Sequence, residues 1–228
     1  MARILLVYCT FIILNISASK GQPSNSIIDL PVQLSISHGT YDELIIYITG
    51  DGGWNSFNEQ MVRQMEQKGY GVVALNSRKY FWHEKTPEQF ANDLEQLSTY
   101  YLKQWNKTTL IIVGYSFGAD VASFLPHRVT DKFHSLIQKI ILISPSSSTD
   151  FAIRLEDLIS DSNNLSRKYI VRPELTQADL PVICTFGREE IKELSTNPVQ
   201  NDRVRIIRLP GDHGYQNNIL LLIESIGI

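Results

Sequence analysis

Short apolar runs alternate with longer amphipathic stretches along most of the chain. Most of the runs are apolar at nearly every position, which is typical of parallel strands buried on both faces of a sheet. The pattern predicts strands over residues 31–36, 44–49, 71–75, 109–113, 139–144, 182–186 and 204–209.

The amphipathic stretches between these runs predict helices. Residues 58–68 carry Met61, Val62 and Met65 on one side and end before Gly69. A second helix is expected to begin after Thr86, an N-cap residue followed by proline and, at the third position, glutamine, and to run to about residue 103. The strongly apolar residues 217–226 predict the last helix.

Strands that alternate with helices form parallel sheets through right-handed crossovers. The sequence therefore predicts an α/β fold: a doubly wound, mostly parallel sheet with helices on both faces. No internal repeat or interdomain linker is visible, so we expect one domain over residues 19–228. Residues 145–178 are compatible with either a small cap or a plain crossover.

The first residues have the features of a secretory signal. Arg3 precedes an apolar run over residues 4–14, and Ser17, Ala18 and Ser19 follow. The run is shorter than the roughly 20 residues of a membrane-spanning helix. We expect residues 1–18 to be removed, leaving a secreted protein without a transmembrane anchor; the alternative is an apolar first strand of the fold.

The composition of the 228-residue chain is that of a globular protein, with 43% hydrophobic and 20% charged residues. Lysine and arginine total 21 against 24 acidic residues, so nothing indicates nucleic-acid binding. Cys9 lies in the predicted signal, which leaves Cys184 as a buried, inert thiol without a disulfide partner. No His/Cys pair has zinc-ligand spacing, and no metal or cofactor is expected.

The sequence Gly-Tyr-Ser-Phe-Gly at 114–118 follows a predicted strand and precedes a helix-forming stretch. This is the context of a nucleophile elbow, in which glycines permit a sharp turn that raises the serine hydroxyl above the strand ends. Ser116 is the predicted nucleophile, and the N–H of Phe117 is predicted to face the oxyanion.

The partners of such a serine follow it in the chain, first the acid and then the histidine. His213 is the histidine that follows the last predicted strand, so it is the candidate general base. The acid is expected after the preceding strand, where Glu190 is the first choice and Glu189 the second. A solvated glutamate pair at a helix start remains the alternative reading.

Residues 50–54, Gly-Asp-Gly-Gly-Trp, follow another predicted strand and match neither nucleotide-binding fingerprint. The N–H of Asp51 or Gly52 is the expected second donor to the oxyanion. The Asp51 carboxylate is either a structural cap or a group for a cationic substrate, a role for which Asp120 is also a candidate. Substrate contacts are expected from Asp51, Trp54, Tyr115 and Lys79.

The aromatic segment 79–82 is expected at the same edge of the sheet, either dipping into a lipid surface, with Arg78 or Lys79 near phosphate, or packed inside.

Three segments together resemble the VirJ/AcvB bacterial virulence proteins, a family of small secreted α/β hydrolases. They are residues 49–54, residues 76–82 with Thr-Pro-Glu at 86–88, and Gly-Tyr-Ser-Phe-Gly-Ala-Asp-Val at 114–121. The resemblance implies an α/β-hydrolase fold with little or no lid, a periplasmic location and a serine hydrolase site at Ser116, His213 and the acid of 187–190. It also implies a link to membrane lipids, through removal of lysine from lysyl-phosphatidylglycerol, or to type IV secretion components.

We therefore expect a periplasmic serine hydrolase that cleaves an ester, foremost an aminoacyl-phospholipid such as lysyl-phosphatidylglycerol, through a Ser-His-Glu triad. Two alternatives stay open. One is a non-catalytic accessory protein of virulence or type IV secretion that retains the fold, and the other is a general carboxylesterase or thioesterase.

Overall fold

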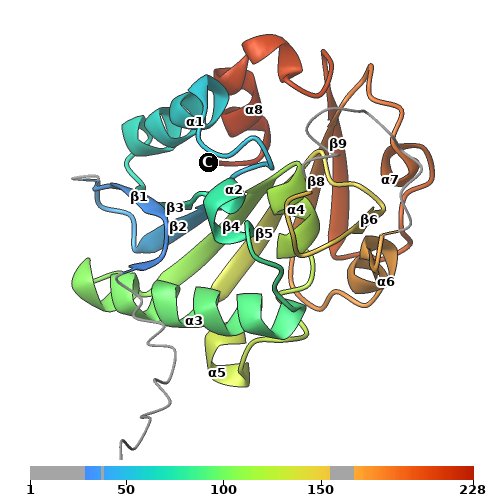
Figure 1. The fold of residues 1–228 in the computed structure, drawn as a ribbon. Coiled ribbons are helices and arrows are strands. Elements are labelled where there is room, and N and C mark those ends of the chain that lie inside the picture. Colours follow the sequence, from blue (N-terminus) through green and yellow to red (C-terminus); the bar gives the residue numbers. More distant parts are fainter. Residues whose placement is uncertain (1–28, 37–38, 155–166) are drawn as a thin grey trace, which may run out of the picture.

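The computed structural model describes residues 29–36, 39–154 and 167–228 (Figure 1). Seven strands form one sheet in the order β1-β3-β2-β4-β5-β8-β9. In chain order these strands are β1 (Val32–Ser35), β2 (Glu43–Ile48), β3 (Gly71–Leu75), β4 (Thr109–Tyr115), β5 (Ile137–Ile143), β8 (Val182–Gly187) and β9 (Val204–Leu209). The predicted doubly wound sheet is confirmed, and each strand lies within two residues of its expected position.

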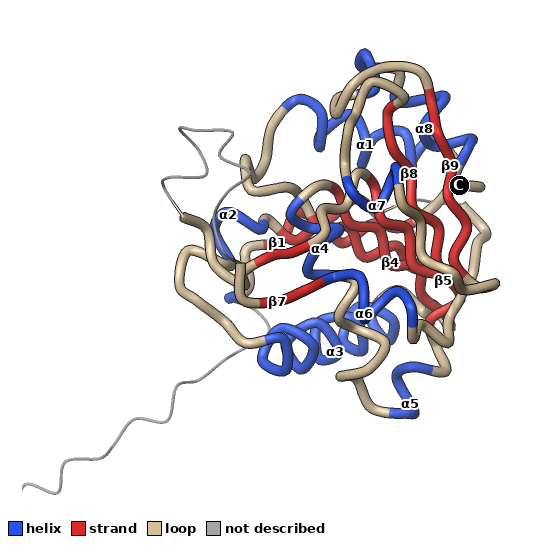
Figure 2. The backbone as a smooth tube through the Cα atoms, turned by 90° about the vertical axis from the view of Figure 1, so that its right-hand side faces the viewer, coloured by secondary structure: helices blue, strands red, loops and turns tan. Residues whose placement is uncertain are grey.

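All neighbouring strands are parallel except β1, which pairs antiparallel with β3 at one edge. The parallel strands therefore present their carboxyl ends at a single edge of the sheet, and the loops that follow them meet there. Figure 2 shows the strands of this sheet side by side between two layers of helices. The segments predicted to carry chemistry follow β2, β4, β8 and β9, so the topology alone gathers them.

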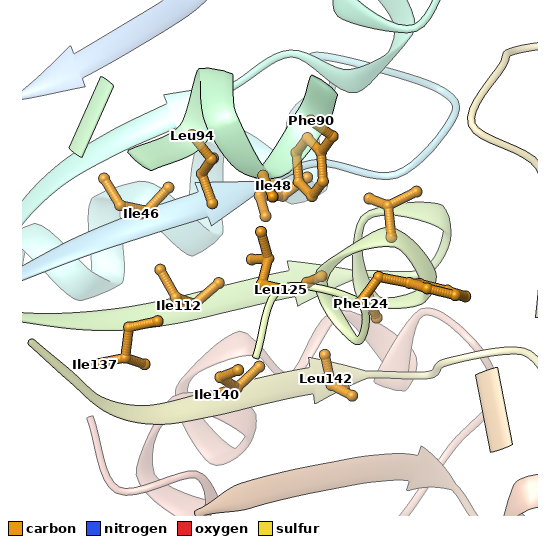
Figure 3. Close-up of a cluster of buried hydrophobic side chains, with 14 of the residues drawn as sticks. Ile46, Ile48, Phe90, Leu94, Ile112, Phe124, Leu125, Ile137, Ile140 and Leu142 are labelled. Atoms are coloured by element: carbon orange, nitrogen blue, oxygen red, sulfur yellow. The ribbon is translucent and has the colours of Figure 1, made fainter. Parts of the chain in front are cut away.

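The two faces of the sheet bury separate clusters of side chains, because successive residues of a strand point to opposite sides. In β2, Ile46 and Ile48 face one cluster while Ile45 and Tyr47 face the other. The helices α3 (Pro87–Gln104) and α4 (Phe117–Ala122) cover the first face, whose packing is shown in Figure 3. The second face is covered by α1 (Ser56–Gln67) and α8 (Ile219–Ser225) (Figure 1).

The predicted start of α3 is confirmed in detail. The Thr86 hydroxyl accepts from the Gln89 N–H at 3.2 Å, and the Gln89 side chain accepts from the Thr86 N–H at 2.9 Å, with Pro87 at the first helical position. This capping box satisfies donors that a helix start leaves free, and each cap contributes on the order of 1 kcal/mol.

The predicted last helix, residues 217–226, is divided. A single 3-10 turn (Tyr215–Asn217) with backbone φ values of 51–56° comes first, and α8 then begins after Asn218, whose side chain accepts from the Leu221 N–H at 3.2 Å. The helix therefore begins two residues later than predicted, because Asn218 and not an earlier residue caps it.

Four short helices were not predicted: α2 (Ser77–Tyr80), α5 (Asp131–His134), α6 (Val171–Thr176) and α7 (Glu193–Thr196). They span four to six residues, too few to show a helical period. In the stretch left open at residues 145–178, the structure has a two-stranded antiparallel sheet, β6 (Ser148–Thr149) with β7 (Tyr169–Ile170), followed by α6. The predicted signal, residues 1–18, and residues 155–166 lie outside the described residues, so the cleavage and the expectation of little or no lid stay predictions.

Candidate active site

Ser116 occupies a sharp turn between β4 and α4. Its φ of 54° and ψ of −120° are strained for a residue with a β-carbon. A β-carbon at Gly114 would lie 2.4 Å from the Gly118 carbonyl oxygen, and one at Gly118 would lie 2.2 Å from the Ile48 carbonyl oxygen. Both positions therefore require glycine, and the turn has the geometry of a nucleophile elbow.

Three side chains form a hydrogen-bonded line at this turn. His213 Nε2 lies 3.0 Å from Ser116 Oγ, and His213 Nδ1 lies 2.7 Å from Glu190 Oε1. An ionised carboxylate only accepts hydrogen bonds, so Nδ1 carries the proton and Nε2 is free to accept one from the serine. The structure thus brings together the first-choice residues of the sequence analysis in the arrangement that a general-base mechanism requires.

The Glu190 carboxylate is held by more than the histidine. Its second oxygen, Oε2, accepts from the Gly187 N–H and from Ser144 Oγ, both at 2.7 Å. Burial by itself raises the pKa of Glu190, but the hydrogen bonds from His213, Ser144 and Gly187 outweigh burial and lower that pKa below its usual value. Glu189, the second choice for the acid, is exposed, and the hydrogen bond to His213 comes from Glu190.

The loop after β2 lies against the serine. A β-carbon at Gly50 would be 3.4 Å from Ser116 Cβ, so the backbone of this loop borders the reacting hydroxyl. The N–H groups of Asp51 and Phe117 donate to no acceptor within the described residues, whereas the Gly52 N–H donates to Asp51 Oδ1 at 2.9 Å. Of the two predicted loop donors, Asp51 is therefore the one with a free N–H.

Two side chains from neighbouring helices fix this loop. Asn58 of α1 is buried and donates to the Gly53 carbonyl oxygen at 2.7 Å, and Tyr47 Oη donates to Asn58 Oδ1 at 2.5 Å. On the other side, Ser77 Oγ donates to the Thr49 carbonyl oxygen at 2.6 Å. A loop that is held at both ends presents its N–H groups in one orientation, which is what oxyanion stabilisation demands.

Tyr115, a predicted substrate contact, supports the histidine loop. Its hydroxyl donates to the His213 carbonyl oxygen at 3.2 Å, and its ring centroid lies 5.3 Å from that of the His213 ring and 4.4 Å from that of the stacked Phe57 ring. The acid loop approaches the same histidine loop closely, because a β-carbon on Gly187 would lie 2.3 Å from the Asp212 carbonyl oxygen.

The other residues predicted to contact substrate are not part of the hydrogen-bonded line of Ser116, His213 and Glu190. Trp54 is half-buried and lines a separate recess of about 200 Å³ between β1 and α1. Lys79 is exposed on α2, the helix that packs against the oxyanion loop. Of the aromatic segment, Tyr80 and Phe81 are buried in the core and only Trp82 is exposed, at 52%. The prediction that this segment packs inside the protein is therefore correct for two of its three aromatic residues, because burial in the core removes their apolar area from water.

Asp120 is buried, so its carboxylate is not available to a cationic substrate group. Its Oδ1 accepts from the Ser146 N–H at 2.5 Å. Burial raises the pKa of Asp120 to about 7, although Lys192 and the Ser146 N–H favour the ionised form.

Three residues that were not predicted from the sequence also support the site: Ser144 and Tyr215 on the side of the acid, and Asn58 at the loop after β2. Ser144 directly follows β5, so the rule that strand ends meet at one edge could have identified it; nothing local distinguishes Asn58 or Tyr215 from core residues.

Cys184 is buried as predicted, and burial raises the pKa of its thiol to about 12. Within residues 29–36, 39–154 and 167–228, no group of three His, Cys, Asp or Glu side chains has an arrangement that holds a metal ion. In the same ranges, no helix has the length and apolar character needed to cross a bilayer.

A family model described as bacterial virulence protein (VirJ) matches residues 42–226, most of the chain and all of the elements that build this site. The chain belongs to the VirJ family. A search of curated protein sequences finds no match.

Solved structures confirm that this VirJ protein has the α/β-hydrolase fold. Est1E from Butyrivibrio proteoclasticus aligns with a TM-score of 0.60 at 16% identity, over 86% of this chain and 90% of Est1E. A lipase-esterase related protein from Clostridium acetobutylicum aligns with a TM-score of 0.61 at 13% identity, over 86% and 98%. The thioesterase domain from the curacin biosynthetic pathway gives 0.55 at 12%, over 86% and 99%. At such identities the likeness concerns the fold.

Proposed function

We propose that this VirJ protein is a periplasmic serine hydrolase that cleaves esters through Ser116, His213 and Glu190. The observation that carries the proposal is the hydrogen-bonded line of 3.0 and 2.7 Å from the serine through the histidine to the glutamate. The strained turn at Ser116 and the free N–H groups beside it supply the two other parts that acyl transfer needs, a half-buried nucleophile at the strand end and oxyanion donors.

In the first half of the reaction, Ser116 Oγ attacks the ester carbonyl carbon while His213 Nε2 takes the hydroxyl proton. The N–H groups of Phe117 and Asp51 stabilise the negative oxygen that forms. The intermediate then expels the alcohol, which receives the proton from His213, and leaves an acyl group on Ser116. Glu190 stays ionised and stabilises the positive imidazolium between these two steps.

In the second half, His213 removes a proton from water, the resulting nucleophile attacks the acyl carbon, and the acid is released as Ser116 regains its proton. No cofactor takes part in these steps.

For the substrate we propose an aminoacyl-phospholipid such as lysyl-phosphatidylglycerol. Asp51 is half-buried and directly follows Gly50, which borders the reacting serine, so its carboxylate is suited to meet a substrate ammonium group. Exposed Arg78, Lys79 and Trp82 follow β3 at the same edge of the sheet, a combination suited to phosphate headgroups and the lipid interface. Cleavage would release lysine and leave phosphatidylglycerol.

Two measurements separate this proposal from its alternatives. A fluorophosphonate probe should label the mature protein and fail to label Ser116→Ala; equal labelling of both would support a non-catalytic role in virulence or type IV secretion. Free lysine should appear when the protein is incubated with vesicles that contain lysyl-phosphatidylglycerol. Rapid cleavage of a short acyl ester without lysine release would instead indicate a general carboxylesterase or thioesterase.

A further inference from the structure

Three buried hydroxyl groups line up behind the acid of the candidate site. Ser144 Oγ lies 2.7 Å from Glu190 Oε2, Tyr215 Oη lies 2.7 Å from Ser144 Oγ, and Thr185 Oγ1 lies 3.0 Å from Tyr215 Oη. Ser144 and Thr185 are fully inaccessible to solvent and Tyr215 is nearly so. In such an environment each of these hydrogen bonds is costly to leave unmade.

The direction of this line follows from the chemistry of its members. A carboxylate has no proton to donate, so the single proton of Ser144 must point to Glu190. Ser144 can then only accept from Tyr215, and Tyr215 in turn can only accept from Thr185. All the hydroxyl dipoles are therefore aligned toward the carboxylate, an arrangement in which each bond strengthens the next.

Two of these residues adopt unfavourable backbone conformations. Ser144 has a φ of 54° and Tyr215 a φ of 53°, a region that residues with a β-carbon rarely occupy, and each costs on the order of 1 kcal/mol. Ser144 is held there from both sides: its N–H donates to the Thr185 carbonyl oxygen, and its own carbonyl oxygen accepts from Lys192 Nζ, both at 2.8 Å.

We propose that Ser144, oriented by Tyr215, is a positioning residue that keeps the Glu190 carboxylate turned with Oε1 toward His213. The proposal rests on the proposed hydrolase function of the same site. Tyr215 stands two residues after His213, so the loop that carries the histidine is also tied, through Ser144, to the acid. A displaced histidine loop would remove the His213 hydrogen bond to Oε1 and, with Tyr215, the group that orients Ser144 toward Oε2.

Two substitutions remove one hydroxyl each. Ser144→Gly deletes the donor to Glu190 and places glycine at a positive φ, where it is favoured, so the backbone of this variant is relieved rather than strained. Tyr215→Phe deletes only the second hydroxyl of the line. The control is Ser98→Ala, which removes an equally buried serine hydroxyl whose bond of 2.7 Å goes to the Leu94 carbonyl oxygen in α3.

Steady-state hydrolysis of p-nitrophenyl acetate provides the first readout. For Ser144→Gly we expect kcat to fall about tenfold with KM unchanged, because the acid acts on the transition state and not on substrate binding. For Tyr215→Phe we expect a smaller fall in kcat, since Ser144 still reaches the carboxylate. Ser98→Ala should keep the wild-type kcat.

The second readout does not depend on turnover. The carboxyl carbon of Glu190, followed by NMR through a pH titration, should show its pKa about one unit higher in Ser144→Gly than in wild type. The shift should be smaller in Tyr215→Phe and absent in Ser98→Ala. A residue that only fills space would not change this titration.

The kinetic measurement and the Glu190 titration test the hydrolase function and the positioning role of Ser144 separately. If Ser144→Gly retains both the wild-type kcat and the wild-type Glu190 titration, the positioning role is wrong while the hydrolase function stands. If wild type and Ser116→Ala hydrolyse the ester equally slowly, the hydrolase function fails, and the titration alone then decides whether Ser144 holds the carboxylate. A titration that moves as much in Ser98→Ala as in Ser144→Gly also overturns the proposal.

Discussion

The Asn58 side chain donates a hydrogen bond of 2.7 Å to the carbonyl oxygen of Gly53, and so joins the first turn of α1 to the loop that carries the candidate oxyanion donor. Asn58 is 1% exposed, and its own oxygen accepts at 2.5 Å from the hydroxyl of Tyr47, near the end of β2. The position of the loop is therefore determined by buried polar contacts from the sheet and the helix, and not by the loop sequence alone.

Asn58→Ala should impair both stability and turnover. We expect a loss of about 2 kcal/mol in the free energy of unfolding, because the Tyr47 hydroxyl and the Gly53 carbonyl oxygen lose their partner in a buried place. Ester hydrolysis should fall about tenfold or more in kcat as the Asp51 N–H loses its orientation. Urea unfolding and steady-state kinetics measure the two effects.

Asn201→Ala is the matched control for this substitution. Asn201 also donates to backbone carbonyl oxygens, those of Leu175, Thr176 and Ala178, but at the amino ends of β8 and β9. The Asn201→Ala variant should be less stable than wild type and should keep the wild-type kcat. A kcat in Asn58→Ala as high as in Asn201→Ala would show that the loop does not depend on Asn58.

The two adjacent glutamates offer a direct test of the acid. Glu190→Gln keeps the size of the side chain but places an uncharged amide opposite His213 Nδ1. The amide oxygen can accept the same hydrogen bond without stabilising the imidazolium, and the amide N–H would favour the wrong tautomer, so kcat should fall by about 10³ or more. Glu189→Gln alters an exposed neighbour and should stay within about twofold of wild type. Rates of ester hydrolysis decide between them; similar losses in both variants would contradict the assignment.

The parts of the molecule that the sequence predicted are those with a local cause. The apolar runs specify the strands, and the Thr86 capping box specifies the start of α3. The turn at Ser116 was predictable because both glycines that it needs, Gly114 and Gly118, lie within five residues of chain, although the carbonyl oxygen that crowds Gly118 belongs to the distant Ile48. The choice of Glu190 followed from topology, because the strand ends of a parallel sheet meet at one edge.

What the sequence did not reveal depends on distant contacts. The Ser144–Tyr215 hydrogen bond joins residues 71 positions apart, and the positive φ of both is imposed by the partners they meet. Tyr80 and Phe81 follow a strand at the edge of the site, yet they turn into the core because Phe90 and Phe117 offer them an apolar surface. The free energy gained by burying these two rings therefore decides where they lie, although they follow a strand end that borders the site.

Asp120 makes the stability of the protein depend on pH. The pKa of this buried carboxyl is raised to about 7 from the usual value near 4, so the folded state holds the proton more firmly than the unfolded chain does. Its contribution to stability is therefore present at low pH and is lost as pH rises from about 4 through about 7. Asp120→Asn cannot ionise and should lack this loss.

Urea unfolding of wild type and Asp120→Asn at pH 5 and pH 8 measures that difference. The decrease in the free energy of unfolding between the two pH values should be smaller in the variant than in wild type. An equal decrease in both proteins would mean that other groups cause it.

Gly187→Ala should separate the acid from the histidine by sterics alone. The added β-carbon would lie 2.3 Å from the carbonyl oxygens of both Gly211 and Asp212, so either the acid loop or the loop that carries His213 must move. These contacts are to backbone and cannot be relieved by a side-chain rotation. We expect a loss of about 2 kcal/mol in stability from overpacking and a loss of about a hundredfold in kcat from the displaced imidazole.

Gly214→Ala is the comparison for this prediction, since a β-carbon there meets nothing closer than Asp212 Oδ1 at 3.5 Å. It changes a glycine directly beside His213 without forcing the loops apart, and it should keep kcat within about threefold of wild type because ordinary van der Waals contact needs no rearrangement. The rate of ester hydrolysis and the free energy of unfolding in urea are to be measured for both variants. If Gly187→Ala retains wild-type kcat, the close approach of the two loops is not what sets the distance between Glu190 and His213.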